Sequence, residues 1–405
     1  MDQQDVVSLA SDLISIPSVN PPGDLEKITT YVINYLKDHG LSAETYEAES
    51  GWPNIVAKLG DPSGGPTLIL NGHTDVVPAN AEQWEWDPFA GTVEDGMIQG
   101  RGASDMKGGL AGIIYAMGKL AEADVELSGA VVLAIVPDEE SGGKYGTEWL
   151  VESGHLPDAD AALVAEPSSA DTITTGQKGS LWLTVESQGS PTHGSLAPFH
   201  GESAILPLTQ LAQELQSLSG EPVDQSDLIA DSVRAHSKDG IVDAFGVKEA
   251  TQALDHTTIN VGTIEGGSKV NVVPETASMS IDIRIPIGRT VDETLAAVED
   301  AIDTVDGGLT YEIQKASEPN FTAHDDELVQ TLQASAGEVF DKQPDPRLMW
   351  ASSDARYFRN QGIPTVQYGP AETEGIHSID EQVSVQELTG MAAVYLEFIQ
   401  RFMGE

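Results

Sequence analysis

The feature that most constrains the fold of this chain is a set of short apolar runs, each followed by acidic residues or histidine. The runs "TLIL" at 67–70, "AVVLAIV" at 130–136 and "AALV" at 161–164 are apolar almost throughout. Strands that are buried on both faces are typical of parallel sheets with helices on either side. The sequence therefore predicts an α/β domain with a mostly parallel sheet between helical layers.

Helical patterns lie before and between these runs. Residues 5–19 and 24–39 are predicted as helices, and apolar residues recur at helical spacing in the second. The segment 106–123 is predicted as an amphipathic helix. One stripe of it contains Met106, Leu110, Ile113, Met117 and Leu120.

The pattern changes near residue 176. Three segments that alternate apolar and polar residues are predicted as strands with one solvated face: "KGSLWLTVESQG", "TTINVGTIEGG" and "TASMSIDIRIP". After residue 289 the helical and apolar-strand pattern returns. We therefore expect a first domain of residues 1–175 and 289–405, with a smaller α+β domain of residues 176–288 inserted in it. The stretch 218–256 has no assigned role.

The charge of the chain is extreme. Twenty Lys and Arg oppose 65 Asp and Glu, a net charge of −45, and the acids are spread along the whole sequence. Such self-repulsion weakens in molar salt, where the screening length falls to about 3 Å. This composition resembles that of proteins from salt-accumulating cells, and it argues against nucleic acid and anionic membranes as partners. With no long apolar run and no signal-peptide pattern, we expect a cytoplasmic protein in a high-salt cytosol.

Several residues with metal-ligating side chains follow the apolar runs. The chain has no cysteine, so a metal site must be built from histidine and carboxylates. His73, Asp75, Glu139, Glu140 and Glu166 each follow a predicted strand, and the carboxyl ends of parallel strands meet at one edge of the sheet. So much acid beside a core requires a positive partner, which favours zinc, or cobalt or manganese in its place.

Each of these residues also has a simpler interpretation. An aspartate such as Asp105, which starts the helix at 106–123, can merely cap it. Glu139 and Glu140 can form a solvated loop, and a lone histidine such as His73 is more often structural than a ligand. The metal hypothesis rests on the joint pattern, because separate strand ends and a helix start carry suitable ligands.

The order of five motifs resembles that of a known family. The motifs are "NGHTDVVP", "GRGASDMKGG", "VPDEESGG", "AEPS" and "GIHSIDE". This set is similar to the di-zinc amidohydrolase and exopeptidase family that includes acetylornithine deacetylase, succinyl-diaminopimelate desuccinylase, aminoacylase and glutamate carboxypeptidase. The resemblance covers nearly the whole chain. It implies a zinc-exopeptidase-like catalytic domain with an inserted lid and dimerisation domain.

The resemblance implies two divalent metal ions, Zn or Co, and a ligand for each. These ligands are His73 and Glu166 at the first metal, Asp105 between both metals, and Glu140 and His377 at the second.

Two further residues receive catalytic roles from the resemblance. Asp75 is expected to orient the ring of His73 through its far nitrogen. Glu139 is expected to act as the general base, taking a proton from the attacking water and delivering it to the leaving amine.

The inserted domain contains a third catalytic candidate. The segment "SQGSPTHGSLAPFHGESAI" resembles the lid of the family, and His193 matches the histidine that stabilises the oxyanion. His200 is a rival, but the "THGS" context favours His193. In dimeric members this histidine reaches the site of the neighbouring subunit, so we expect a homodimer through the inserted domain.

Substrate-binding residues are expected in the same domain. Asn271 and Arg284 resemble lid residues that hold a substrate carboxylate, and a salt bridge on an acidic sheet is the credible alternative for Arg284. Lys178 is expected at the surface near the hinge. The segment "MWASSDARYF" resembles one that lines the substrate pocket and contributes Ser352, but Trp350 stands where several relatives have glycine.

Three functions are compatible with these residues. The favoured one is hydrolysis of the amide of a small N-acyl amino acid, as in acetylornithine deacetylase or succinyl-diaminopimelate desuccinylase. A dipeptidase or carboxypeptidase is the alternative, because it uses the same metals and differs only in its pocket. A non-catalytic protein that binds metal or amino acids is the third, although such a protein would not need Glu139.

Overall fold

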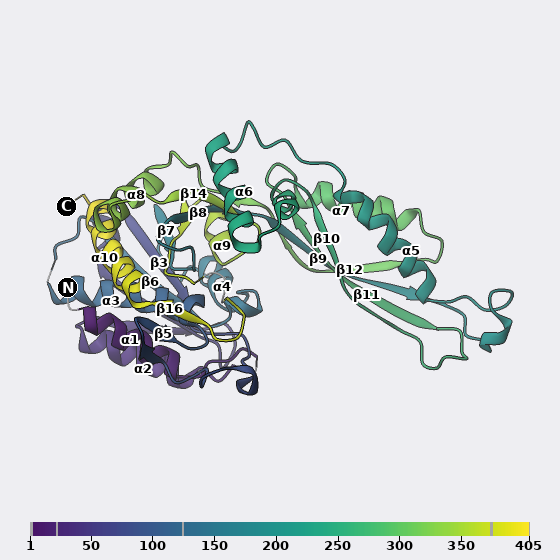
Figure 1. Ribbon diagram of the computed structural model, residues 1–405, viewed down its shortest axis with the longest axis horizontal. Coiled ribbons are helices and arrows are strands. Elements are labelled where there is room, and N and C mark those ends of the chain that lie inside the picture. The colour runs from purple at the N-terminus through teal and green to yellow at the C-terminus, as the bar shows by residue number, and fades with distance from the viewer. Residues whose placement is uncertain (1–2, 22, 124, 373–375, 405) are drawn as a thin grey trace. The chain divides into compact units, whose positions relative to one another are not determined.

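The computed structural model describes residues 3–21, 23–123, 125–372 and 376–404. The chain divides into two compact units, which are described separately (Figure 1). Unit 1 contains residues 1–175, 322–347 and 353–405, and unit 2 contains residues 176–321 and 348–352.

A mixed sheet forms the centre of unit 1. Among the described residues its order is β1-β2-β6-β3-β7-β15-β8, with β14 paired to β8, and β13, which pairs with residues 176–177 at the end of β8, belongs to unit 2. The central strands β6, β3, β7 and β15 are parallel, whereas β1, β2 and β8 pair antiparallel with their neighbours. The strands are β1 (Ala43–Glu47), β2 (Pro53–Gly60), β3 (Thr67–His73), β6 (Ala130–Val136), β7 (Ala161–Val164), β8 (Thr172–Gln177), β13 (Asn320–Phe321), β14 (Asp345–Met349) and β15 (Thr365–Gln367).

Helices cover both faces of this sheet, and alternate residues of its strands β3, β6 and β7 contribute to the two helical cores. Leu68 and Leu70 of β3 belong to a core shared with α1, α2, α3, α8 and α10, while Ile69 belongs to a core shared with α4 and α9. The predicted α/β sandwich is thereby confirmed. The helices are α1 (Gln3–Ser15), α2 (Glu26–Asp38), α3 (Gly108–Glu122), α4 (Thr147–Glu152), α8 (Glu327–Phe340), α9 (Ala355–Asn360) and α10 (Val385–Phe402).

A small antiparallel sheet in unit 1 joins two segments that are far apart in sequence. Its order is β16-β5-β4, with β4 (Thr92–Glu94), β5 (Met97–Gln99) and β16 (Gln382–Ser384). The pairing of β16 with β5 brings the chain after residue 376 beside the segment that precedes α3.

Unit 2 contains a four-stranded antiparallel sheet of order β10-β11-β9-β12. Alternate residues of β11 are buried, as its sequence predicts, and their apolar side chains pack with α5 (Ile205–Gln216) and α7 (Val291–Asp303). The predicted α+β character of the inserted domain is confirmed. The strands are β9 (Gly179–Gln188), β10 (Thr258–Gly266), β11 (Thr276–Ile285) and β12 (Thr310–Ser317).

Unit 2 extends further along the chain than the expected boundary at residue 288. Helix α7 and strand β12 lie between residues 289 and 321, a range that the sequence pattern places in the first domain. Strand β12 pairs with β9, and Val298 and Ile302 of α7 pack into the core of unit 2. The helical pattern of α7 indicated a helix correctly but did not indicate which sheet it covers.

The unassigned stretch 218–256 forms part of unit 2. It contains α6 (Asp231–Phe245), whose residues Val233 and Ile241 share a small core with Leu348. The hydroxyl of Ser237 accepts a hydrogen bond from the Leu348 backbone N–H. One function of the stretch is therefore to hold the short segment 348–352 in this unit.

Candidate metal centre

Seven of the predicted site residues lie together in unit 1. His73 ends β3, Glu166 lies two residues beyond β7, and Glu139 and Glu140 lie three and four residues beyond β6. Because these strands are parallel, their carboxyl ends meet at one edge of the sheet. Asp105 comes from the loop before α3, and His377 from the segment before β16. Asp75 is the seventh residue.

Close packing of α3 against Ala165, the residue after β7, brings the loop of Asp105 to the edge that holds Glu166. A Cβ atom on Gly109 would lie only 1.9 Å from the carbonyl oxygen of Ala165. Only glycine permits this approach. The second glycine of the "MKGG" motif is thus required by the position of the helix.

His73 and Asp105 form the centre of the cluster. The Nε2 atom of His73 lies 3.1 Å from Oδ1 of Asp105 and 3.8 Å from Oε1 of Glu166. On the other side, Nε2 of His377 lies 3.2 Å from Oδ2 of Asp105 and 3.0 Å from Oε2 of Glu140. Asp105 therefore presents one oxygen to each histidine.

These separations fit ligands around metal ions. Four ligands at about 2.0–2.1 Å from a tetrahedral Zn²⁺ lie about 3.3 Å from one another, close to the distances observed here. Two groups have ligand atoms within 4.8 Å of one another: His73, Glu139 and Glu166, and His73, Asp105 and Glu140. The donor set of imidazole and carboxylate suits zinc or a similar divalent ion.

Asp75 connects the histidine to the glutamate pair. Nδ1 of His73 lies 2.9 Å from the Asp75 carbonyl oxygen and 3.3 Å from its carboxylate Oδ1. The same carboxylate accepts hydrogen bonds from the backbone N–H groups of Glu139 and Glu140, both at 3.2 Å, and from Asn20. Asp75, fully buried, thus fixes both the ring of His73 and the loop after β6.

The electrostatics of the cluster show an excess of negative charge. Burial alone would lower the pKa of His73, but hydrogen bonds to Asp105 and Asp75 raise it well above its usual value. Hydrogen bonds to Asp105 and Glu140 raise the pKa of His377 to about 10. Burial and the charge of Asp105 raise the pKa of Glu166. Five carboxylates face two imidazoles, so the site favours a bound cation.

Glu139 differs from its neighbour Glu140 in its surroundings. Burial raises the pKa of Glu139 well above its usual value, and the charge of Asp354 adds to this effect. Burial also raises the pKa of Glu140, but the hydrogen bond to His377 opposes it. Glu140 is therefore engaged by a histidine, whereas Glu139 has a carboxylate neighbour that disfavours its charge.

His193 and Asn271 lie together in unit 2. The backbone N–H of Gly194 donates to the Asn271 carbonyl, and the backbones of His193 and Val272 pair in an isolated antiparallel β-bridge. The side chains of His193 and Asn271 are exposed. Nδ1 of His193 accepts a hydrogen bond from the backbone N–H of Ser195, which leaves Nε2 as the protonated nitrogen of the neutral ring. His200 is also exposed.

Arg284 and Ser352 also lie together in unit 2. Nη1 of Arg284 lies 3.4 Å from the Ser352 hydroxyl, while Nε and Nη2 donate to the carboxylate of Asp282. The salt bridge that we considered for Arg284 is thus present. Trp350 is 44% exposed and contacts Phe245 edge-on, so it does not point into a core.

The expected surface position of Lys178 is wrong. Lys178 is 3% exposed, and its ammonium donates to the carbonyl of His256 and the hydroxyl of Thr258. Burial lowers its pKa to about 7, and the nearby charge of Arg284 contributes. The polar context "GQKGS" gave no sign of burial, because the groups that enclose Lys178 are distant in sequence.

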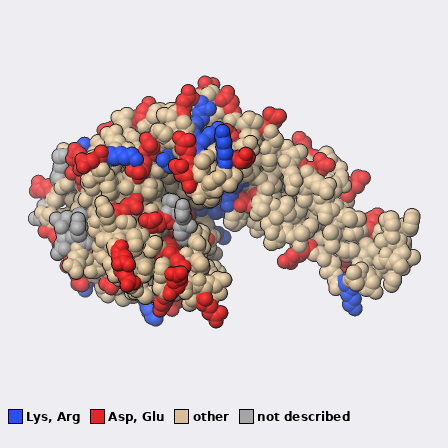
Figure 2. All heavy atoms as spheres, viewed as in Figure 1, with Lys and Arg blue, Asp and Glu red and all other residues tan. Residues whose placement is uncertain are grey.

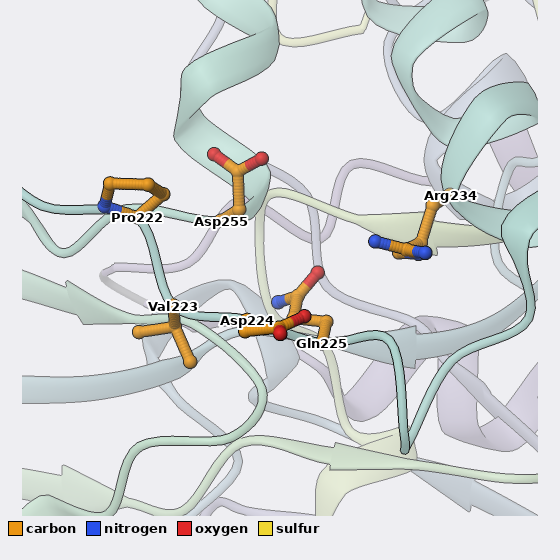
Figure 3. Close-up of a pocket in the computed structure, with 6 residues that line it drawn as sticks. All are labelled: Pro222, Val223, Asp224, Gln225, Arg234 and Asp255. Atoms are coloured by element: carbon orange, nitrogen blue, oxygen red, sulfur yellow. The ribbon is translucent and has the colours of Figure 1, made fainter.

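A cavity of about 290 Å³ in unit 2 is lined by six residues, and none of them is a predicted site residue. It is lined by residues of both charges, with Arg234 opposite Asp224 and Asp255 (Figure 3). Gln225 in its wall donates to the carbonyls of Leu254 and Ile287. This lining selects no single class of ligand.

Sequence reasoning missed two residues that support the cluster in unit 1. Asn20 donates to Asp75, and Glu381 accepts hydrogen bonds from the loop of Asp105. Glu381 lies within the quoted motif "GIHSIDE", but among 65 acidic residues nothing in the sequence marks it as buried.

Comparison with known proteins gives consistent matches. The model of the family described as Peptidase family M20/M25/M40 matches residues 69–401. A succinyl-diaminopimelate desuccinylase of Rhodospirillum centenum is 29% identical over 419 residues, covering 98% of this chain and 97% of that protein. The curated relatives and the family support metal-dependent hydrolysis of an amide bond in an N-acyl amino acid.

Solved structures share the fold over the whole chain. An M20-family metallo-carboxypeptidase from Sulfolobus solfataricus has a TM-score of 0.82 at 20% identity, covering 100% of both chains. A protein of Bacillus subtilis described as a dinuclear metal-binding peptidase of the M20 family has a TM-score of 0.69 at 16% identity, covering 99% of this chain and 98% of that one. Since the family model matches most of the sequence, the chain belongs to peptidase family M20/M25/M40.

Proposed function

We propose that this protein is a di-metal hydrolase that removes the acyl group of a small N-acyl amino acid, in the manner of a desuccinylase or deacetylase. The observation that carries the proposal is the arrangement at the sheet edge of unit 1, where Asp105 faces one histidine on each side and Glu139 lies beside His73. The dinuclear site of the similar Bacillus subtilis fold supports two metal ions.

The distances suggest how the ligands are shared. His73 and Glu166 would hold the first ion, Glu140 and His377 the second, and Asp105 both. Two such ions, Zn or Co, would lower the pKa of the attacking water and polarise the substrate carbonyl. Asp75 keeps the His73 ring oriented through the contacts at Nδ1.

Glu139 is the general base in this proposal. Its carboxylate would accept the proton of the attacking water and then protonate the amine nitrogen as the C–N bond breaks. The products are a carboxylate and a free amine. Its burial supports the role, because a raised pKa brings a carboxylate closer to the working pH.

Three residues of unit 2 are proposed to bind substrate, and a fourth to stabilise the oxyanion. Arg284, Ser352 and Asn271 would hold the substrate carboxylate, with Nη1 of Arg284 as the donor that Asp282 leaves free. His193 would donate from Nε2 to the oxyanion, which its hydrogen bond from Ser195 supports.

A dipeptidase or carboxypeptidase remains the second candidate. The S. solfataricus structure, described as a metallo-carboxypeptidase, has this fold, and the same cluster would cleave a peptide bond. A protein that only binds metal or amino acids would not require Glu139 beside its ligands, so we place that function last.

We further propose a homodimer through the inserted domain. Leu196, Phe199 and Val270 are exposed apolar residues near His193 in sequence or by backbone pairing, and Phe199 is 95% exposed. Sedimentation in molar KCl should give a dimer for the wild type and a monomer for Phe199→Asp. A monomeric wild type would contradict this assembly.

The deciding experiment measures amine release in molar KCl with added Zn²⁺ or Co²⁺ and a chelated control. The panel contains N-acetylornithine, N-succinyl-diaminopimelate, other N-acyl amino acids and dipeptides. Chelator-sensitive release from an N-acyl amino acid supports the proposal, and preference for dipeptides supports the peptidase. Absence of cleavage with two metals bound would favour the binding protein.

A further inference from the structure

Glu381 is a buried carboxylate with four hydrogen-bond donors from one short segment of the chain. It is fully buried. Its Oε2 accepts from Nη1 of Arg101 at 2.6 Å and from the Gly102 N–H at 3.1 Å. Its Oε1 accepts from the N–H groups of Ser104 at 2.9 Å and Asp105 at 3.0 Å. The last of these donors belongs to the residue that faces both histidines.

Glu381 lies on the segment that carries His377. The other guanidinium nitrogen of Arg101, Nη2, donates to the Ser378 carbonyl, one residue beyond His377. The Gly100 N–H donates to the Glu381 backbone carbonyl, and the Ser104 hydroxyl donates to the Gln382 backbone carbonyl. The segment of Asp105 and the segment of His377 are therefore joined by both side chains and backbone.

Arg101 is itself held in place. It is 3% exposed, and its guanidinium lies 5.1 Å from the ring centroid of Trp84, which is also buried. A planar guanidinium can stack on the ring while it donates to two acceptors, which an ammonium cannot reproduce. The interaction of Arg101 with Glu381 therefore depends on the orientation of the guanidinium as well as on its charge.

We propose that Glu381 and Arg101 are positioning residues that set the separation of Asp105 and His377, and so the affinity and geometry of the second metal position. The inference rests on the proposed function only for the presence of the metals. Hydrogen-bond partners behind metal ligands typically change metal affinity about 10–100-fold when removed.

If Glu381 did not have this role, a substitution that neutralises its carboxylate would leave metal binding unchanged. Glu381→Gln keeps the shape but has only one acceptor oxygen. Its amide nitrogen must therefore face either Arg101 and Gly102, or Ser104 and Asp105. Glu387→Gln is a matched control, because Glu387 also accepts backbone N–H groups in unit 1, from Ala170 and Ala371, but none from the segment 101–105.

The test is titration of the metal-free full-length chain with Co²⁺ in molar KCl, followed by calorimetry and visible absorption. We expect the wild type and Glu387→Gln to bind two ions. Glu381→Gln should bind one ion about 10–100-fold more weakly, with an altered spectrum for that ion. Wild-type affinities and spectrum in Glu381→Gln would overturn the inference.

A second variant covers the case in which Glu381→Gln does not fold. Arg101→Lys retains the charge beside Glu381 but loses the planar pair of donors, and the same weakening at one ion is expected. If this folded variant binds both ions as the wild type does, the inference is wrong. If the wild type itself binds no Co²⁺, the proposed function fails instead, which distinguishes the two.

Discussion

At the scale of single residues, adjacent carboxylates acquire different properties from their neighbours. Glu139 and Glu140 both depend on Asp75, which accepts their backbone N–H groups, yet only Glu140 contacts a histidine through its side chain. The difference comes from position on the loop after β6. In the proposed mechanism this difference lets Glu140 bind metal while Glu139 remains available for proton transfer.

Replacement of Glu139 by glutamine tests this division of roles. The amide cannot accept the proton of the attacking water, so we expect kcat to fall about 10²–10⁴-fold while two Co²⁺ ions still bind. Glu152→Gln, on the exposed side of α4, serves as the control and should retain activity. Full activity in Glu139→Gln with metal bound would contradict the mechanism.

Lys178 makes stability depend on pH in a definite direction. Its pKa is lowered to about 7 by burial, with Arg284 adding to the shift and Asp255 and Asp282 opposing it. Between pH 7 and its unfolded value the folded chain binds fewer protons than the unfolded chain. Stability therefore rises with pH in this window, by at most about 1.4 kcal/mol per pH unit.

This pH dependence is tested by comparing Lys178→Met with Lys342→Met. Lys342 is an exposed lysine of unit 1 and serves as the control. Urea unfolding from pH 7 to pH 10 should show a flatter pH dependence for Lys178→Met than for the wild type. The Lys342→Met profile should follow the wild type. Identical slopes in Lys178→Met and the wild type would show that Lys178 does not titrate in this window.

At the scale of elements, prediction succeeded where the signal was local. The strand that begins with "TLIL" at residue 67 and the helix in 106–123 were predicted to within three residues at each end, because periodicity and burial lie in the same short window. The helix α6 was missed because its sequence presents only a weak apolar stripe, with Val233, Ser237 and Ile241 buried.

The same distinction holds for the site. Ligand types at strand ends were visible because topology brings parallel ends together, and the structure places His73, Glu140 and Glu166 at one edge. Glu381 and the burial of Lys178 were not visible. Both depend on packing between segments distant in sequence, which leaves no trace in local composition.

We expect the segment 348–352 to influence the substrate preference of the enzyme. Trp350 contacts Phe245 of α6, and Ser352 contacts Arg284 within the same unit. Trp350→Gly should shift the ratio of kcat/KM for N-succinyl over N-acetyl substrates toward succinyl by about tenfold, since a bulky side chain is removed.

Phe245→Ala is the companion variant, because it removes the edge contact to Trp350. Steady-state kinetics with both substrates should show a smaller shift in the same direction. A ratio that stays constant in both variants would place Trp350 outside the acyl site.

At the scale of the whole molecule, charge is the dominant property. On the visible face, acidic side chains are spread over the surface and basic ones are few (Figure 2). Within the described residues, no helix is long and apolar enough to span a membrane. Repulsion within the net charge of −45 destabilises the compact state, so the stability of this fold depends on the salt concentration.

Thermal unfolding should therefore depend strongly on salt. The midpoint is expected to rise by at least about 5 °C between dilute buffer and molar KCl, because the screening length falls from about 30 Å at 0.01 M to about 3 Å at 1 M. An uncharged osmolyte such as sucrose strengthens burial without screening, so at equal osmolality it should stabilise less. If KCl raised the midpoint no more than sucrose does, repulsion among the 65 acids would not limit stability, and the argument for a high-salt cytosol would lose its physical basis.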